Sequence, residues 1–198
     1  MRAKYLEEKE IAALEARLGP YAWLPYAVSI DTGLRIGDVA SLRWCDLQGS
    51  KLTFVAQKTG KPGTAYVSED TARRLWQLRR RAVSEWIFPS PTDPGRHISR
   101  QILWKRLKAA CRACRLNPDG VSPHSFRKVY GVREYREHGL RAAQAGLQHT
   151  DVSTTEIYAL ADWLTSENAD KPLLRSDLGR VIRYIAGWLG IPIDQPPR

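Results

Sequence analysis

Three short segments of the sequence bring together residue types that can cut a phosphodiester bond. The first reads Thr-Gly-Leu-Arg from residue 32 and ends on Arg35. The second places His124 and Arg127 three residues apart, and the third places Tyr158 nine residues after His149. Two arginines, two histidines and a tyrosine indicate chemistry at a phosphate group that needs no metal ion.

Each of these residue types meets one demand of that chemistry. Cations must neutralise the charge on the non-bridging oxygens, and the planar guanidinium of arginine does so with two hydrogen bonds. Histidine transfers protons near neutral pH, and a general acid must protonate the departing 5′ oxygen. A tyrosine phenol can attack phosphorus and form a covalent ester that conserves the bond energy.

Each residue taken alone also has an ordinary explanation. Arg35 could form a surface ion pair, His124 could cap a helix, and Tyr158 could be a half-buried core residue. Tyr130 and Tyr135 are rival nucleophiles, but neither lies in the Thr-Thr-x-x-Tyr context of Tyr158. The joint occurrence of the three segments, rather than any one residue, therefore supports the phosphate-cleaving site.

Helices are expected to position these groups, with one β-hairpin among them. Strands are predicted over residues 51–56 and 64–67, joined by a turn at residues 58–63. Apolar periodicity predicts helices over residues 4–18, 21–30, 36–43, 68–84, 99–114, 123–138, 140–147 and 153–161. Arg35 then stands at a helix N-terminus, which adds positive potential for a phosphate, and Asp38 lies one turn further on.

The charge of the chain favours a polyanionic partner. Thirty-one Lys and Arg residues against 21 Asp and Glu residues give a net charge of +10. Nucleic acid is the first candidate for that partner and an anionic membrane surface the second. No apolar run approaches the ~20 residues of a membrane span, and the N-terminus lacks a signal peptide, so a cytoplasmic location is expected.

The cysteines suggest neither a disulfide framework nor a metal site. There are three, Cys45, Cys111 and Cys114, which is an odd and sparse set. Cys111 and Cys114 form a lone Cys-x-x-Cys pair, whereas structural zinc is held by four ligands. No metal ion and no organic cofactor is expected.

The ordered motifs resemble those of the phage integrase, or tyrosine recombinase, family. That family shows T-G-L-R-x-x-E/D followed by L-x-W, then H-x-x-R, then L-G-H and T-T-x-x-Y. The resemblance extends from about residue 5 to about residue 160. It implies that Arg35 and Arg127 hold the scissile phosphate and that His124 is an acid/base partner near the nucleophile. It further implies that His149 donates a hydrogen bond to a non-bridging oxygen and that Tyr158 attacks phosphorus.

The resemblance also implies a general-acid lysine on a hairpin turn and an acidic supporting residue. Lys58 is the better match for the lysine, with Lys61 as the fallback, and Asp38 matches the acidic residue. Two positions depart from the family pattern. Gln148 replaces the glycine before the histidine, and Lys128 stands where many members have histidine. The stretch from residue 139 to 149 is also slightly short.

The implied fold is mainly α with a small antiparallel sheet of two or three strands, similar to the tyrosine recombinase and type IB topoisomerase catalytic domains. The implied reaction is site-specific recombination through a 3′-phosphotyrosyl intermediate and a Holliday junction. The implied partner is double-stranded DNA, bound by a homo-tetramer on two sites, with a monomer expected without DNA. A prokaryotic, phage or mobile-element origin fits that resemblance.

Residues 1–176 are expected to form the catalytic domain, and residues 177–198 a helix and tail that packs either on a neighbouring subunit or on its own domain. Family members usually carry a core-binding domain before the catalytic domain, so the chain is expected to be either an excised fragment or a short member. Three rival functions remain open. They are a non-catalytic DNA-binding regulator, a relaxing topoisomerase and a hairpin-telomere resolvase.

Overall fold

The computed structural model describes residues 3–138, 146 and 147, and this part contains six α-helices and a small sheet. The helices are α1 (Glu8–Leu18), α2 (Pro20–Thr32), α3 (Ile36–Ala40), α4 (Glu69–Arg79), α5 (Arg100–Ala113) and α6 (Pro123–His138). The three strands are β1 (Leu47–Gln48), β2 (Lys51–Val55) and β3 (Pro62–Tyr66), and a single 3₁₀ turn, η1 (Trp44–Asp46), precedes them. The expected mainly α fold with a small antiparallel sheet is confirmed.

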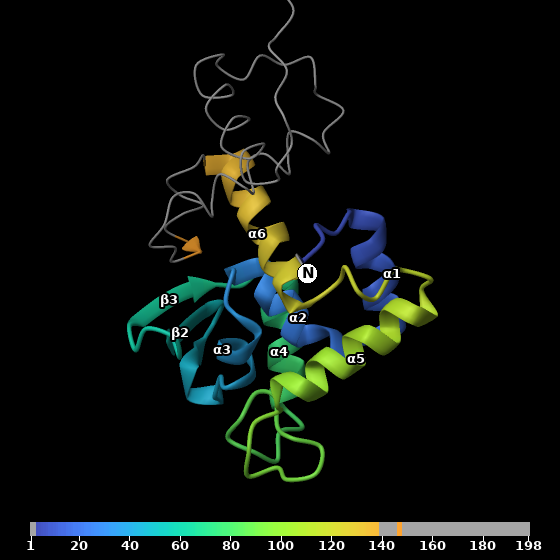
Figure 1. Ribbon diagram of the computed structural model, residues 1–198. Helices are drawn as coiled ribbons and strands as arrows, with labels where there is room; N and C mark the ends of the chain where they lie inside the picture. Colours follow the sequence, from blue (N-terminus) through green and yellow to red (C-terminus); the bar gives the residue numbers. More distant parts are fainter. Residues whose placement is uncertain (1–2, 139–145, 148–198) are drawn as a thin grey trace, which may run out of the picture.

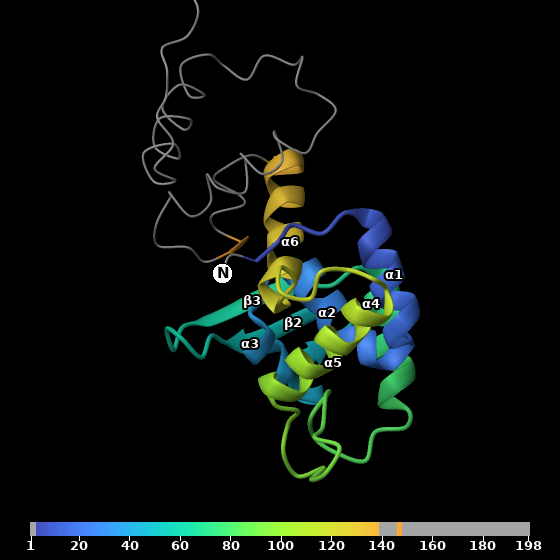
Figure 2. The same cartoon turned by 45° about the vertical axis from the view of Figure 1, so that its right-hand side comes forward.

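Helix α2 lies at the centre, because its sequence is apolar on nearly every side. Residues 23–29 are all buried, and α2 contacts α1, α3, α4, α6 and β3. The sheet lies on one side of α2, while α1 and α5 lie on the other (Figures 1 and 2). An all-apolar helix is stable in water only when it is covered in this way.

Aromatic side chains join α2 to the two helices that follow late in the chain. The ring of Phe126 on α6 lies 4.9 Å from that of Tyr26 and 5.6 Å from that of Trp23, measured between centroids. The Tyr26 hydroxyl donates a 2.6 Å hydrogen bond to the Leu103 carbonyl of α5. Such contacts bury large apolar areas, and the hydrogen bond supplies a partner for the buried Tyr26 hydroxyl. They set where α6 begins relative to α2.

The sheet is antiparallel, in the order β1-β2-β3. In β2, Leu52 and Phe54 point into the core and alternate with exposed residues, as the sequence pattern predicts. Strand β1 was not expected, because a strand of two residues carries no alternation. The β2–β3 turn closes through the Ala56 carbonyl, which accepts the N–H groups of Thr59 and Gly60 at 3.1 and 2.8 Å.

Three helices are shorter than their periodicity predicts. Helix α1 begins at Glu8 rather than at residue 4, because the Glu10 carboxylate caps it by accepting the Glu7 N–H at 3.1 Å. Helix α3 ends at Ala40, and Arg43 then pairs as extended backbone with Trp86. Helix α4 ends at Arg79, and Arg80 is its C-cap residue.

Candidate functional site

The turn between α2 and α3 presents Arg35 at the beginning of α3. Gly33 ends α2 in the left-handed conformation, with φ of 67°, which glycine adopts without steric cost. The Ser29 hydroxyl donates to the Leu34 carbonyl at 2.8 Å, and the Thr32 hydroxyl accepts the Leu34 N–H at 3.2 Å. Both polar side chains are buried, so they hold the turn rigidly. Arg35 is the N-cap residue of α3 and is only partly buried.

The first turn of α6 carries His124 and Arg127, one helical turn apart. Arg127 is buried, with a relative exposure of 5%. Its guanidinium donates one hydrogen bond to the Gly33 carbonyl and another to the Leu147 carbonyl. Arg127 thereby joins two segments that lie far apart in the sequence, one leading to Arg35 and the other leading towards position 149.

Tyr130 packs between the same two segments, one turn beyond Arg127. A Cβ atom placed on Gly33 would lie 2.4 Å from the Tyr130 ring, and one placed on Gly146 would lie 2.1 Å from the Tyr130 hydroxyl. Real Cβ atoms do not approach other atoms so closely, so both positions accept only glycine around this ring. From the sequence Tyr130 is only a rival nucleophile, whereas in the structure its ring packs against the segments that contain Gly33 and Gly146.

Partial burial and nearby positive charges favour the neutral form of the His124 imidazole. Burial of part of the ring is the largest cause that lowers the pKa of His124 below its ordinary value, and the positive charge of Arg127 is the next. Arg35 and Lys128 lower the pKa further. Arg35, His124 and Arg127 therefore lie close enough to interact electrostatically, in a place where an anion would be attracted.

Asp38 and Gln57 attach the β2–β3 turn to α3. The buried Asp38 carboxylate accepts the Gln57 N–H at 2.9 Å, and Lys58 follows directly on the exposed part of the turn. Lys61 lies directly before β3, and its carbonyl accepts the Ala56 N–H at 2.9 Å. The turn that carries both candidate lysines is thus held against the helix that Arg35 begins.

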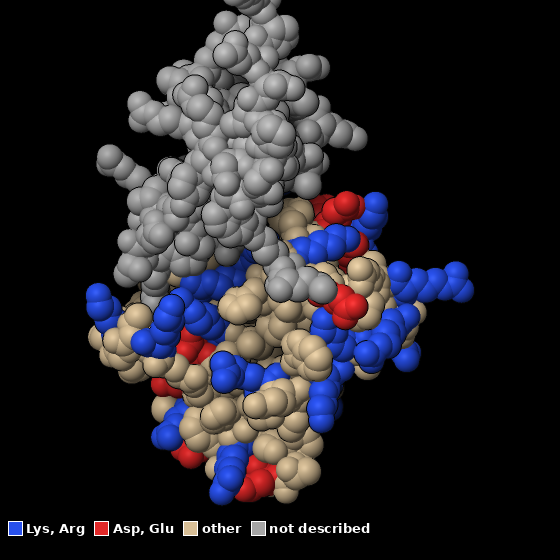
Figure 3. Space-filling view, viewed as in Figure 1, with Lys and Arg blue, Asp and Glu red and all other residues tan. Residues whose placement is uncertain are grey.

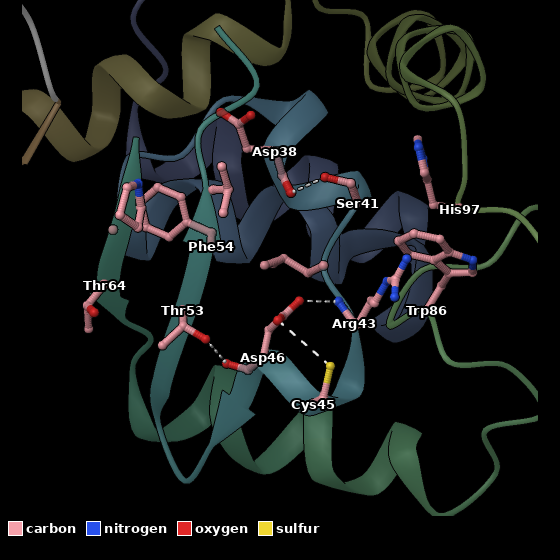
Figure 4. A pocket seen from close by; sticks show the side chains of 14 residues that line it. Asp38, Ser41, Arg43, Cys45, Asp46, Thr53, Phe54, Thr64, Trp86 and His97 are labelled. Atoms are coloured by element: carbon pink, nitrogen blue, oxygen red, sulfur yellow. Dashed lines mark hydrogen bonds between the residues drawn. The ribbon is translucent and has the colours of Figure 1, made fainter. Parts of the chain in front are cut away.

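An open groove of about 840 Å³ lies between the sheet and the connection after α4 (Figure 4). In it the Arg43 guanidinium stacks 4.5 Å from the Trp86 ring, and His97 meets that ring edge-on at 5.3 Å. Asp38 lines the groove from α3, whereas the other residues proposed from the sequence do not line it. The groove therefore lies beside the candidate site rather than within it.

Basic side chains extend from the candidate site over the surface around it. Figure 3 shows Lys and Arg gathered over the sheet side and along α5, with few acidic side chains between them. Helix α5 contains no acidic residue, and its exposed cations are Arg100, Lys105, Arg106 and Arg112. A folded basic face of this kind suits a polyanion.

Two of the proposed site residues, His149 and Tyr158, lie outside the described residues, as does Gln148. The same holds for the predicted helix over 153–161, for the tail from residue 177 and for the predicted helix over 140–147 except its last two residues. The structure therefore brings together Arg35, Asp38, His124, Arg127 and the Lys58 turn. Among the described residues there is no cluster of three or more His, Cys, Asp or Glu side chains that could hold a metal ion, and none of the helices has the length and apolar character needed to cross a membrane.

The contacts of Gln57 with α3 and the packing role of Tyr130 do not follow from the motifs. Tyr130 follows Arg127 by three residues, so a helical projection places it on the face of the predicted site. For Gln57 the only signal was its position beside Lys58, since the contact of a turn with a helix about 20 residues earlier is not visible in a local pattern.

The chain is similar to known proteins in its sequence and in its fold. The model of the phage integrase family matches residues 6–163. Among curated proteins, the tyrosine recombinase XerD of Bradyrhizobium diazoefficiens is 30% identical over 172 residues, covering 79% of this chain and 54% of that protein. The tyrosine recombinase XerC of Erythrobacter litoralis is 37% identical over 111 residues, covering 52% of this chain and 35% of that protein. The chain thus spans about half the length, or less, of these two relatives.

Solved structures share the fold. The crystal structure of XerA recombinase superposes with a TM-score of 0.68 at 19% identity, covering 100% of this chain and 67% of that one. A lambda integrase dimer bound to a COC′ core site superposes with a TM-score of 0.70 at 18% identity, covering 88% of this chain and 52% of that one. From its motifs, its fold and the extent of the family match, the chain belongs to the phage integrase family of tyrosine recombinases.

Proposed function

We propose that the chain cleaves and rejoins DNA at specific sites through a covalent 3′-phosphotyrosyl intermediate. The observation that carries this proposal is the convergence of Arg35, His124, Arg127 and the Lys58 turn beside a basic face. The similarity to XerD, a tyrosine recombinase, and to lambda integrase, which was solved bound to DNA, supports it.

In the proposed reaction Tyr158 attacks the scissile phosphorus, and the bond from phosphorus to the 5′ oxygen breaks. Arg35 and Arg127 neutralise the charge that develops on the non-bridging oxygens, and His149 donates a hydrogen bond to one of them. The neutral imidazole of His124 can accept a proton near the nucleophile, since its pKa is lowered.

Lys58 is the proposed general acid, with Lys61 as the fallback, and it gives its proton to the departing 5′ oxygen. Asp38 supports this lysine indirectly, by binding the N–H of Gln57 beside it. A 5′ hydroxyl of a partner duplex then reverses the step. The finer assembly that we propose is a homo-tetramer on two DNA sites, which exchanges strands through a Holliday junction without metal or cofactor.

The test is covalent capture. The chain is incubated with a nicked suicide DNA substrate, which loses a short product strand and so prevents religation, and adducts are separated on a denaturing gel. We expect an adduct that Tyr158→Phe abolishes, while Tyr130→Phe retains it as the matched control. A substrate that is bound but yields no adduct would instead favour a non-catalytic DNA-binding regulator. Closed-end products would identify a telomere resolvase, and relaxation of any supercoiled plasmid a topoisomerase.

A further inference from the structure

Gln57 makes three hydrogen bonds to α3 and lies directly before Lys58. Its backbone N–H donates to the Asp38 carboxylate at 2.9 Å. Its side-chain amide donates to the Gly37 carbonyl at 3.3 Å and to the Ser41 hydroxyl at 3.1 Å. One residue thus attaches the hairpin turn to α3 and to its C-cap residue Ser41.

The surroundings of Gln57 favour this single arrangement. The Ser41 hydroxyl donates its own hydrogen to the Asp38 carbonyl at 3.1 Å, so its lone pairs face the Gln57 amide (Figure 4 shows this Ser41 bond). A Cβ atom on Gly37 would lie 3.2 Å from the Gln57 side-chain oxygen and 3.1 Å from the Arg100 side chain. The bare backbone of Gly37 therefore leaves the room in which the glutamine lies.

We propose that Gln57 is a positioning residue that sets where the Lys58 ammonium meets the departing 5′ oxygen, an inference that rests on the function proposed above. Lys58 is exposed and its side chain is flexible, so its location depends on how firmly the turn is held. Without the amide, only the single backbone bond to Asp38 joins Gln57 to α3. General acids contribute about 10²- to 10⁴-fold to such reactions. A displaced Lys58 gives up part of this factor, and we expect Gln57→Ala to slow cleavage about tenfold.

A sulfur-substituted substrate separates positioning of the acid from a general structural role. When sulfur replaces the bridging 5′ oxygen, attack by Tyr158 forms the tyrosyl–phosphorus bond and breaks the phosphorus–sulfur bond. The leaving group is then a thiolate, whose conjugate acid has a pKa of about 8.5, far below that of the alcohol that leaves from the oxygen substrate. A thiolate departs without a proton, so this substrate does not need the ammonium of Lys58.

Cleavage rates are measured under single-turnover conditions with both substrates, for the wild-type chain, Gln57→Ala and Lys58→Ala. Gln48→Ala is the matched control, because Gln48 is exposed on the same sheet and makes no side-chain hydrogen bond to the described residues. We expect Gln57→Ala to be about tenfold slow on the oxygen substrate and equal to wild type on the sulfur substrate. Lys58→Ala should follow the same pattern with a larger loss, and Ser41→Ala with a smaller one.

Two results would overturn the inference while the proposed function stands. In the first, Gln57→Ala is equally slow on both substrates, which means that it disturbs the site as a whole. In the second, it cleaves both at the wild-type rate, which means that the amide bonds do not place Lys58. If the wild-type chain forms no adduct with either substrate, the proposed function is wrong, and the inference that rests on it is wrong as well. Thermal unfolding of each variant identifies any loss that comes from misfolding.

Discussion

Replacing Gly33 by alanine should destabilise the protein more than the same replacement at a glycine that has a similar φ but no close neighbour. Two costs add at this position. An L-residue in the left-handed conformation costs about 1–2 kcal/mol, and Gly33 has φ of 67°. The new Cβ would also lie 2.4 Å from the Tyr130 ring, and overpacking of a filled interior costs about 1–3 kcal/mol. The expected loss is therefore about 2–5 kcal/mol, out of a typical stability of about 5–15 kcal/mol.

Gly146 also lies against this ring, since a Cβ atom placed on Gly146 would be 2.1 Å from the Tyr130 hydroxyl. Urea unfolding followed by circular dichroism measures the loss. Gly49→Ala is the control, since Gly49 has φ of 60° but has no atom within 4 Å of the Cβ position. It isolates the conformational cost, and the difference between the two variants gives the packing cost.

A third variant tests the packing argument directly. The double variant Gly33→Ala with Tyr130→Ala removes the ring, so its loss should be smaller than the sum of the two single losses by about 1–3 kcal/mol. The reasoning is refuted if Gly33→Ala costs no more than Gly49→Ala, or if the single losses simply add.

Three further predictions concern the charged residues of the site. In an NMR titration the pKa of His124 should lie below 6.5. The unfolded chain then takes up the proton first as the pH drops, so the stability should fall from pH 6.5 through the folded-state pKa, and His124→Gln should remove that part of the pH dependence. Asp38→Ala should lower the free energy of unfolding, measured in urea, by about 1–3 kcal/mol, and Asp38→Asn by less, because the amide oxygen still accepts the Gln57 N–H. If Asp38→Ala loses no more stability than Asp119→Ala at an exposed position, the bond to Gln57 does not stabilise the protein. DNA affinity should fall steeply with salt, and Arg35→Ala should lower the slope of log Kd against log salt concentration by about 1, whereas an unchanged slope would mean that Arg35 does not contact a phosphate.

Much of the fold follows from local patterns in the sequence. Helix α2 was recognisable from its apolar run, and the hairpin from the alternation of Leu52 and Phe54 before a Gly-rich turn. The start of α1 and the end of α3 could not be recognised in this way. The first depends on the hydrogen bond between Glu7 and Glu10, and the second on the pairing of Arg43 with Trp86. Periodicity reports which residues are buried, but it does not report where backbone pairing takes over.

The candidate site could be predicted as a set of residues but not as an arrangement. The motifs named Arg35, His124, Arg127 and Lys58, which the structure brings to one region. They gave no sign that the buried guanidinium of Arg127 binds two backbone carbonyls, since such contacts depend on the packing of α6 against α2. The catalytic roles of these four residues remain predictions, as do the assignments of His149 and Tyr158.

The two arginines of the site differ in what their removal can reveal. Arg35 makes no hydrogen bond or ion pair with the described residues, so its substitution removes a charge without breaking a contact within the described scaffold. Arg127 fastens the segment before Arg35 to the segment before His149, so its loss loosens the frame as well as removing a charge. Even lysine is no substitute, because a single ammonium on a flexible stem lacks the wide planar fork that reaches both carbonyls. An inactive Arg127 variant therefore mixes two defects, and only its unfolding curve can separate them.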